Sequence, residues 1–422
     1  MYENEIKIER AILAGVHTDN PNKLLDTTNE SLDELCELAK TAGVEVVGYV
    51  IQNRPAPDNA TYLGEGKLDE LLNAAQELDA DVVIFDDELS PVQVRNISDH
   101  LDMKVLDRTS LILDIFAMRA ITKEGKIQVE LAQLKYMLPR LTGMGQALSR
   151  LGGGIGTRGP GETKLETDRR HIRRRIEFLT EELKEVQKHR DLLRVRRAKD
   201  NQTVVALVGY TNAGKSTLLN LLTDASVLAE NKLFATLDPT QRSLTLSDNR
   251  KILLVDTVGF IRKLPHHLVK AFKSTLEEAA LADVLVHVID ISNDEYETHI
   301  KVVDNILEEL GASGKPTIAV LNKIDLAEDK IIPKTIDACT KTVCISAQNK
   351  IGIDELVEII EAVVPGQKRD VVLNIPYSDA GCVSALHENQ LVNSEQYTPD
   401  GILINAKIDA QCYDKMRKYI VK

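Results

Sequence analysis

The stretch that decides the fold is Gly209-Tyr210-Thr211-Asn212-Ala213-Gly214-Lys215-Ser216. It fits the pattern G-x-x-x-x-G-K-[ST], follows the apolar run Val204–Val208 and opens the helical segment Thr217–Leu222. In this setting glycines let backbone N–H groups close around phosphate oxygens, and the helix N-terminus adds partial positive charge. We expect Lys215 to reach the β- and γ-phosphates of a nucleotide and Ser216 to bind Mg²⁺ through its hydroxyl. The alternative is a glycine turn that matches by chance.

Three further segments argue against chance. The first, Asp256-Thr257-Val258-Gly259, follows another apolar strand. Asp256 would hold Mg²⁺ through water, and the Gly259 N–H would meet the γ-phosphate. We therefore predict Lys215, Thr236 and Gly259 as the catalytic groups, with Thr236 coming from the loop described below.

The second and third segments would bind the base. The second, Asn322-Lys323-Ile324-Asp325, ends a strand, and the third, Ser346-Ala347-Gln348, follows some 20 residues later. A carboxylate at Asp325 can accept hydrogen bonds from guanine N1–H and the exocyclic amine, which adenine does not offer. Main-chain N–H groups of the third segment would bind the guanine O6. The order of the segments at strand ends predicts a guanine nucleotide, GTP or GDP.

A loop between the first two segments carries the last candidates, Phe234-Ala235-Thr236-Leu237-Asp238-Pro239-Thr240. A mobile loop here would supply a threonine to the Mg²⁺ shell when the γ-phosphate is present. We favour Thr236 over Thr240 for this role and place residues 234–238 at the nucleotide. A plain hairpin connection is the alternative.

One position departs from the common pattern of such sites. Many GTPases place a glutamine after this glycine to orient the attacking water, and here the residue is Phe260. An apolar ring can neither accept a proton nor align water. We therefore expect slow intrinsic turnover that a partner surface accelerates. His266 and His267 lie nearby in sequence, and we interpret them as solvated residues.

The segment from Thr203 to about Val364 alternates strands and helices, which predicts a doubly wound, mainly parallel sheet. The first hundred residues alternate in the same way and predict a smaller α/β unit. After Pro365 the remaining chain reads as β-α-β-β-α. We predict four domains, at residues 1–108, 109–199, 200–366 and 367–422.

The second of these domains has a coiled-coil-like pattern. Apolar residues recur every three or four positions on each side of a glycine-rich interval, at Ile127, Leu131, Leu134, Leu138 and Leu141 and again at Ile172, Ile176, Leu179, Leu183 and Val186. Two such stripes predict an antiparallel helical hairpin. The interval Leu141–Leu165 is rich in glycine and should be mobile in the free protein.

Gly64-Glu65-Gly66-Lys67 invites a second nucleotide site, in the N-terminal unit. It lacks the full phosphate-loop spacing. We favour a turn that opens a helix and leave an adenine-nucleotide site as the alternative.

Composition argues against several classes of protein. The 422 residues contain 52 Lys and Arg against 65 Asp and Glu, and the net charge of −13 argues against a protein that spreads over nucleic acid or an anionic membrane. The chain has no Trp, which disfavours an aromatic stacking surface for single-stranded nucleic acid. The five Cys form no C-x-x-C pair, which fits reduced thiols better than disulfides or a zinc site. The sequence shows neither a long apolar run nor a lipidation motif, which argues against a membrane-traffic GTPase.

The mean charge hides a basic arm. Residues 140–199 contain 16 Lys and Arg, 12 of them Arg, against 8 Asp and Glu. Arginine can pair with phosphate and stack on bases, whereas the ordinary interpretation of a charge run is a solvated helix face. The candidate RNA contacts are Arg158, Lys164, Arg169, Arg170, Arg173 and Arg174.

Several long strings resemble the HflX family of translational GTPases in the Obg–HflX group: Asp107–Thr109, Leu113–Phe116, Glu124–Leu134, Gly152–Thr163 and Phe234–Thr240. The resemblance implies GTP hydrolysis stimulated by the ribosome, binding chiefly to the large subunit and its rRNA, and dissociation or rescue of ribosomes stalled under stress. We further expect a cytoplasmic monomer with no DNA partner and no integral membrane association. The alternative is a nucleotide-gated regulator whose output is docking alone, with hydrolysis only resetting it.

Overall fold

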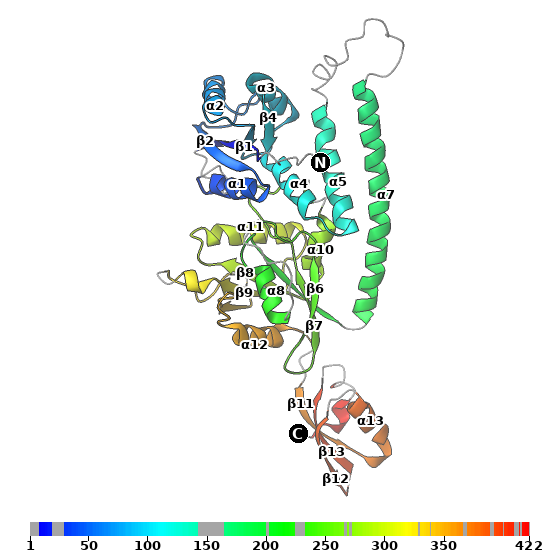
Figure 1. The fold of residues 1–422 in the computed structure, drawn as a ribbon. Helices are drawn as coiled ribbons and strands as arrows, with labels where there is room; N and C mark the ends of the chain where they lie inside the picture. The colour runs from blue at the N-terminus through cyan, green and yellow to red at the C-terminus, as the bar shows by residue number, and fades with distance from the viewer. Residues whose placement is uncertain are drawn as a thin grey trace, which may run out of the picture.

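The computed structural model describes residues 8–18, 29–141, 164–199, 202–223, 233–265, 268–269, 272–327, 330–337, 339–365, 369–388, 392–399, 401–408, 413 and 416–421. Figure 1 shows an N-terminal α/β unit, a helical hairpin beside it, a second α/β unit and a small C-terminal unit. Among the described residues, none of the helices is long and apolar enough to cross a membrane. Arg158, His266, His267 and most of the glycine-rich interval lie outside the described residues.

The N-terminal unit is a parallel sheet with strand order β2-β1-β3-β4, covered by helices on both faces. Successive residues of a strand point to opposite faces, so Ala11 and Leu13 pack under α1 and α4, and Ile12 and Ala14 pack under α2 and α3. The elements are β1 (Arg10–His17), α1 (Asn29–Thr41), β2 (Glu45–Asn53), α2 (Glu65–Glu77), β3 (Val82–Phe85), α3 (Pro91–Leu101), β4 (Lys104–Asp107) and α4 (Arg108–Arg119).

Local sequence explains where these helices begin. Ser90 caps α3 with a reciprocal bond to Gln93, and Pro91 occupies the first turn, where its missing N–H costs nothing. Gly64 is the residue before α2, and its N–H donates to Gln52 Oε1 at 2.9 Å. The Gly64–Lys67 segment is therefore a turn that opens a helix, as we favoured.

The hairpin pairs α5 (Lys123–Arg140) with α7 (Lys164–Lys199). Its core contains the expected stripes in part: Ile127, Leu131 and Leu179 are buried, with Leu134, Ile176, Leu183 and Val186 packed around them. Helix α4 lies where we expected the hairpin domain to begin, but its side chains share a core with α1. The second half of α7 instead runs beside the second α/β unit (Figure 1), where Arg190 pairs with Glu278 at 2.6 Å.

The second α/β unit, the G domain, has the strand order β10-β9-β8-β5-β7-β6, with only β6 antiparallel among these paired strands. Helices α10 and α11 cover one face, and α8 and α12 cover the other. Its strands are β5 (Thr203–Gly209), β6 (Thr240–Thr245), β7 (Lys251–Asp256), β8 (Val284–Asp290), β9 (Thr317–Asn322) and β10 (Lys341–Cys344). Its helices are α8 (Lys215–Thr223), α10 (Lys273–Leu281), α11 (Tyr296–Glu309), the 3-10 helix η2 (Ile324–Leu326) and α12 (Ile353–Val363). The G domain thus has the doubly wound, mainly parallel sheet that we predicted, and the N-terminal unit is the smaller α/β unit with a parallel sheet that we expected.

The C-terminal unit is an antiparallel sheet with order β11-β13-β12. Its described elements are β11 (Arg369–Ile375), η3 (Tyr377–Asp379), α13 (Ala380–Glu388), β12 (Val392–Thr398), β13 (Gly401–Ile408) and η4 (Arg417–Tyr419). The expected β-α-β-β order is confirmed. Part of the last expected helix lies outside the described residues.

Candidate nucleotide site

Five parallel strands of the G domain end at one edge of the sheet, and the four predicted segments follow four of them. Two glycines of the first segment permit close approach at this edge. Gly209 (φ +152°) faces the Val288 carbonyl, and a Cβ on Gly214 (φ +99°) would lie 2.3 Å from Asn322 Nδ2. The pocket so formed is lined by Thr211, Asn212, Gly214, Lys215, Ser216, Thr217, Phe234, Ala235, Thr236, Thr257 and Gly259.

Lys215 lies at the floor of this pocket and is 6% exposed. Its ammonium donates to the carbonyls of Gly209 at 3.1 Å and Tyr210 at 2.7 Å. Burial lowers the pKa of Lys215 to about 8, while the nearby Asp256 carboxylate opposes this shift. A cation held in a dry, glycine-rich loop is suited to a phosphate group.

Three oxygen-bearing side chains converge beside Lys215. Ser216 Oγ lies 2.6 Å from Asp256 Oδ2 and 3.0 Å from Thr236 Oγ1, and Thr236 Oγ1 lies 3.3 Å from the same carboxylate oxygen. The other oxygen, Asp256 Oδ1, is buried without a hydrogen-bond partner. Burial raises the pKa of Asp256, opposed first by Lys215. Two hydroxyls and a carboxylate with a spare oxygen are the hard ligands that Mg²⁺ prefers, so these residues fit that ion.

Thr240 is not part of this group. It begins β6 and pairs there with Asp256 across the sheet backbone.

The segment after β7 packs tightly against the first segment. A Cβ on Gly259 would lie 2.9 Å from Thr211 Cα and 3.1 Å from Lys215 Nζ. The Thr257 hydroxyl donates to the Leu207 carbonyl at 2.7 Å, and Val258 is buried. Glycine is therefore required here, because a side chain would collide with the backbone of Thr211.

Phe260 points away from the pocket. Its ring is fully buried in the core, and its backbone bonds to Gly209 O at 3.1 Å and Thr211 N at 2.8 Å. The ring is held in place and offers no polar atom that could align a water molecule.

Asn322 joins the two base segments to the phosphate loop. Its Nδ2 donates to the Ala213 carbonyl at 2.8 Å, and its Oδ1 accepts from the Ala347 N–H at 3.0 Å. Lys323 has left-handed backbone (φ +63°) and its Nζ pairs with Asp290 at 2.7 Å.

The remaining base candidates lie around Asn322. Asp325 Oδ1 is buried without a hydrogen-bond partner, which fits a carboxylate that awaits donors. The Ile324 N–H bonds to the Ile345 carbonyl at 3.3 Å, Ser346 is buried, and Gln348 is exposed in the following turn.

Two of the loop residues that we placed at the nucleotide are not among those that line the pocket. Phe234, Ala235 and Thr236 line the pocket, but Leu237 is buried in the hydrophobic core. Asp238 instead bonds to the connection between α4 and α5. Sequence position alone could not distinguish these directions, because neighbouring residues of a loop can face opposite sides.

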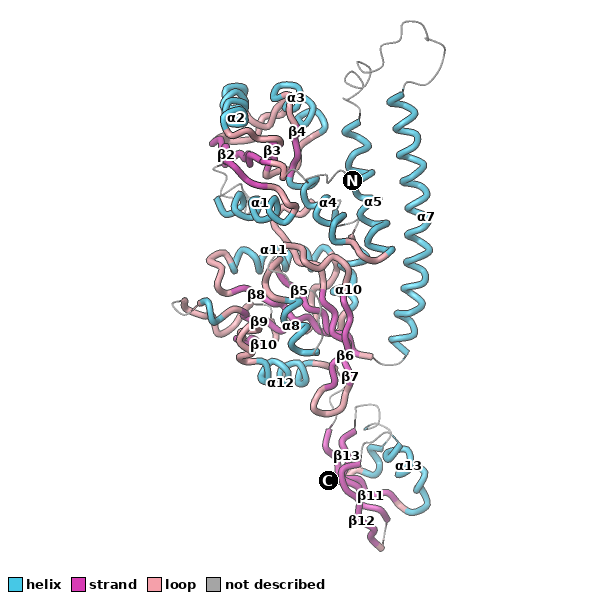
Figure 2. The backbone as a smooth tube through the Cα atoms, viewed as in Figure 1, coloured by secondary structure: helices cyan, strands magenta, loops and turns pink. Residues whose placement is uncertain are grey.

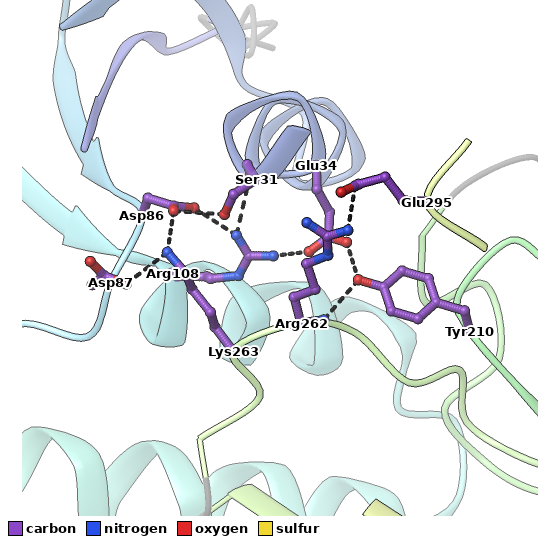
Figure 3. A network of polar contacts seen from close by, with 9 residues as sticks. All are labelled: Ser31, Glu34, Asp86, Asp87, Arg108, Tyr210, Arg262, Lys263 and Glu295. Atoms are coloured by element: carbon purple, nitrogen blue, oxygen red, sulfur yellow. Dashed lines mark hydrogen bonds and ion pairs between the residues drawn. The ribbon is translucent and has the colours of Figure 1, made fainter. Parts of the chain in front are cut away.

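A polar network joins the G domain to the N-terminal unit (Figure 3), and sequence reasoning missed it. The Tyr210 hydroxyl donates to Glu34 and accepts from the Arg262 N–H at 2.8 Å. Lys263 Nζ lies 2.5 Å from Asp86 and 2.8 Å from Asp87. Tyr210 lies in the phosphate loop, and the two basic residues follow Gly259 by three and four positions, so both sides of the nucleotide pocket are anchored to another domain.

Arg108 completes this network. It is 1% exposed, pairs with Asp86 at 2.7 Å and contacts Glu34. Burial lowers the pKa of Arg108 to about 10. Tyr210 and Arg108 lie in sequence motifs, but no motif or periodic pattern pairs them with their partners, because the bonded residues lie far apart in the chain.

The candidate RNA residues that the structure describes lie at the start of α7. Arg170, Arg173 and Arg174 are exposed, Arg169 is half-buried, and Lys164 is the first residue of the helix. Arg175, next to them, pairs with Glu130 on α5 at 2.6 Å.

Comparison with known proteins covers nearly the whole chain. Three family models match: "GTP-binding GTPase N-terminal" over residues 29–117, "GTP-binding GTPase Middle Region" over 119–197, and "50S ribosome-binding GTPase" over 204–323. The boundary between the first two models falls in the last turn of α4, whose side chains pack on α1.

Proteins named GTPase HflX are similar along their full length. That of Caldanaerobacter subterraneus subsp. tengcongensis is 51% identical over 98% of this chain and 94% of its own, and that of Escherichia coli is 43% identical over 93% and 92%. A solved GTP-binding protein from Sulfolobus solfataricus, in complex with GDP, is 28% identical over 84% of this chain and 98% of its own, with a TM-score of 0.43. The chain therefore belongs to the HflX family of GTPases and is a ribosome-associated enzyme that binds and hydrolyses GTP.

Proposed function

We propose that this enzyme binds the large ribosomal subunit and uses GTP to dissociate or rescue ribosomes that stall under stress. It would act in the cytoplasm as a monomer and bind neither DNA nor membranes. The observation that carries the proposal is the exposed arginine cluster on α7, in a chain whose G domain matches a family described as a 50S ribosome-binding GTPase. Phosphate contacts by arginine supply affinity for RNA regardless of its sequence.

The chemistry follows from the pocket. Lys215 would leave the Gly209 and Tyr210 carbonyls and bind the β- and γ-phosphates, since a phosphate is the stronger partner for a cation. Ser216, Thr236 and Asp256 would hold Mg²⁺, which neutralises charge that develops on the phosphates. The Gly259 N–H would donate to the γ-phosphate. Asn322 would hold the base site in place through its bonds to Ala213 and Ala347. Asp325 would accept hydrogen bonds from guanine N1–H and the exocyclic amine.

Water activation is the step that this pocket does not complete alone. The Phe260 ring is buried and apolar, so it cannot orient the nucleophile. We infer slow turnover in the free enzyme and faster turnover when the ribosome supplies a polar group at the pocket. Because a positioning group can change turnover by orders of magnitude, the difference should be large.

Separated ribosomal subunits test the proposal. We expect large subunits to stimulate GTP hydrolysis and small subunits to leave it near the basal rate. A basal rate that neither subunit changes would refute the proposal.

A second measurement separates the proposal from docking alone. Ribosome splitting is followed with GTP and with a non-hydrolysable analogue. Splitting with the analogue would make binding the working step and hydrolysis the release step, and a failure to split with either nucleotide would contradict a role in dissociation.

A further inference from the structure

We propose that Asp238 is a positioning residue: it fastens the loop that carries Thr236 to the N-terminus of helix α5, and so holds the Thr236 hydroxyl at the metal site. The inference rests on the proposed role of Thr236 as a Mg²⁺ ligand. It assigns Asp238 a contact with the helical hairpin in place of the nucleotide contact that its sequence position suggested.

The contact uses both carboxylate oxygens. Asp238 Oδ2 accepts from the N–H groups of Ile121 at 2.8 Å and Thr122 at 2.9 Å, and Oδ1 accepts from the Thr122 hydroxyl. Thr122 is itself the cap of α5, because its Oγ1 accepts from the Gly125 N–H at 2.9 Å. A carboxylate at this point accepts from the N–H groups of the cap residue and of the residue before it, and its charge complements the helix dipole.

Gly125 shows that the helix is built for this carboxylate. It is buried in the first turn of α5, and a Cβ there would lie 2.5 Å from Asp238 Oδ1. Glycine in a helix costs about 0.5–1 kcal/mol relative to alanine. A Cβ at this position would have to displace the Asp238 carboxylate from its contacts.

The loop is also anchored before Thr236. The Phe234 ring is buried and meets Phe116 of α4 edge to face, with ring centroids 4.8 Å apart. Phe234 has left-handed backbone (φ +53°), which a non-glycine residue adopts only where its surroundings hold it. Thr236 therefore lies midway between one anchor on α4 and one on α5.

This arrangement prepares the metal site. Thr236 Oγ1 already lies 3.0 Å from Ser216 and 3.3 Å from Asp256. A loop that is held at both ends loses less conformational entropy when Thr236 binds an ion. Without Asp238, the loop would have to be ordered by Mg²⁺ itself, which weakens the apparent affinity for the ion.

The test compares the Mg²⁺ dependence of GTP hydrolysis in four variants. Asp238→Ala should raise the Mg²⁺ concentration for half-maximal rate about fivefold to tenfold, as expected when a helix cap of ~1 kcal/mol or slightly more is removed. Asp238→Asn keeps one acceptor and should restore part of the effect. Thr122→Val removes the hydroxyl, and Gly125→Ala fills the space for the carboxylate, so both should shift the dependence in the same direction.

Two controls keep the result specific. Gly381 in α13 has nothing within 4 Å of its added Cβ, so Gly381→Ala is a matched glycine substitution that should leave the Mg²⁺ dependence unchanged. GDP affinity in EDTA should stay within about twofold of wild type in every variant, because the phosphate loop is intact. A thermal unfolding scan confirms that each variant folds.

The outcomes separate the two proposals. If Asp238→Ala weakens GDP binding in EDTA while Thr122→Val and Gly125→Ala behave as wild type, Asp238 is a nucleotide contact and the inference is wrong. If all of these variants keep the wild-type Mg²⁺ dependence while Thr236→Ala loses it, only the inference fails. If Thr236→Ala also keeps it, the proposed role of Thr236 in metal binding fails first.

Discussion

Replacing Asp325 by Asn should move the preference of the enzyme from guanine to xanthine nucleotides. Asp325 lies in η2, three residues after Asn322, and its Oδ1 is buried without a hydrogen-bond partner. In the proposed site the carboxylate accepts from guanine N1–H and from the exocyclic amine. Asparagine keeps one acceptor oxygen but turns an NH₂ group toward the amine, so that two donors face each other.

The magnitude follows from these two bonds. A hydrogen bond to a charged group contributes about 1.5–3 kcal/mol, so losing one and weakening the other costs roughly 2–5 kcal/mol. At ~1.4 kcal/mol per factor of ten, GTP affinity should fall by roughly 30-fold to 3,000-fold. Xanthine carries a carbonyl in place of the amine and can accept from the new NH₂ group, so XTP affinity should rise.

Equilibrium titration of the wild type and the variant with GTP and XTP, in Mg²⁺, measures both changes. Asp294→Asn is a suitable control: its side chain is 92% exposed, it pairs with Lys330 at the surface, and it is not one of the residues that line the nucleotide pocket. Unchanged GTP affinity in Asp325→Asn, or a variant that loses GTP without gaining XTP, would refute the assignment of Asp325 as the base-reading residue.

Three other predictions concern the interdomain network, the arginine cluster and the phosphate loop. Asp86→Ala removes a fully buried carboxylate that pairs with both Arg108 and Lys263, and should lower the free energy of unfolding by about 3–5 kcal/mol. The Asp87 side chain is one-third exposed, so Asp87→Ala should lower it by about 1 kcal/mol or less. Equal losses in urea denaturation would contradict the network. Charge reversal of three exposed or half-buried arginines of α7 should weaken ribosome binding: Arg169, Arg170 and Arg173. The slope of log affinity against log salt concentration should fall by about 0.7–0.9 for each phosphate that is no longer neutralised. An unchanged slope would show that the cluster is a solvated face. Burial lowers the pKa of Lys215 to about 8, so above that pH Lys215 is neutral in the free enzyme and must take up a proton to bind phosphate. GTP affinity should therefore fall as the pH rises above 8, by at most about tenfold per pH unit. Calorimetry in buffers of different ionisation enthalpy should detect this proton uptake in the wild type and not in Lys215→Met.

That the four segments converge could be predicted because each of them follows a strand of one sheet. Gly209–Ser216 carries its own backbone geometry, and Asp256 and Asn322 each end a strand of one parallel sheet. Strand ends of such a sheet meet at one edge, so order in the sequence is enough to bring these residues together. The position of Thr236 near these segments could be predicted for the same reason, because its loop connects two of them.

The hairpin could be predicted in outline for a similar reason. The stripes of Ile127, Leu131 and Leu179 repeat at helical spacing, which fixes a shared apolar face whatever the rest of the chain does. The spacing did not determine what the second half of the longer helix packs against. In the structure Arg190 of that helix pairs with Glu278 of the G domain, and these two residues are 88 positions apart in the chain.

The sequence by itself determined a doubly wound GTPase domain, its nucleotide pocket and the family, since motifs and periodic patterns act over a few residues or along one sheet edge. Only the tertiary structure decided where Asp238 and Lys263 point. A carboxylate or ammonium group has the same chemistry at every position of a sequence, and its partner is determined by the packing of distant segments. Asp238 bonds to Thr122, which is 116 positions away, and Lys263 bonds to Asp86, which is 177 positions away. Those two contacts join the loops of the nucleotide pocket to the hairpin and to the N-terminal sheet.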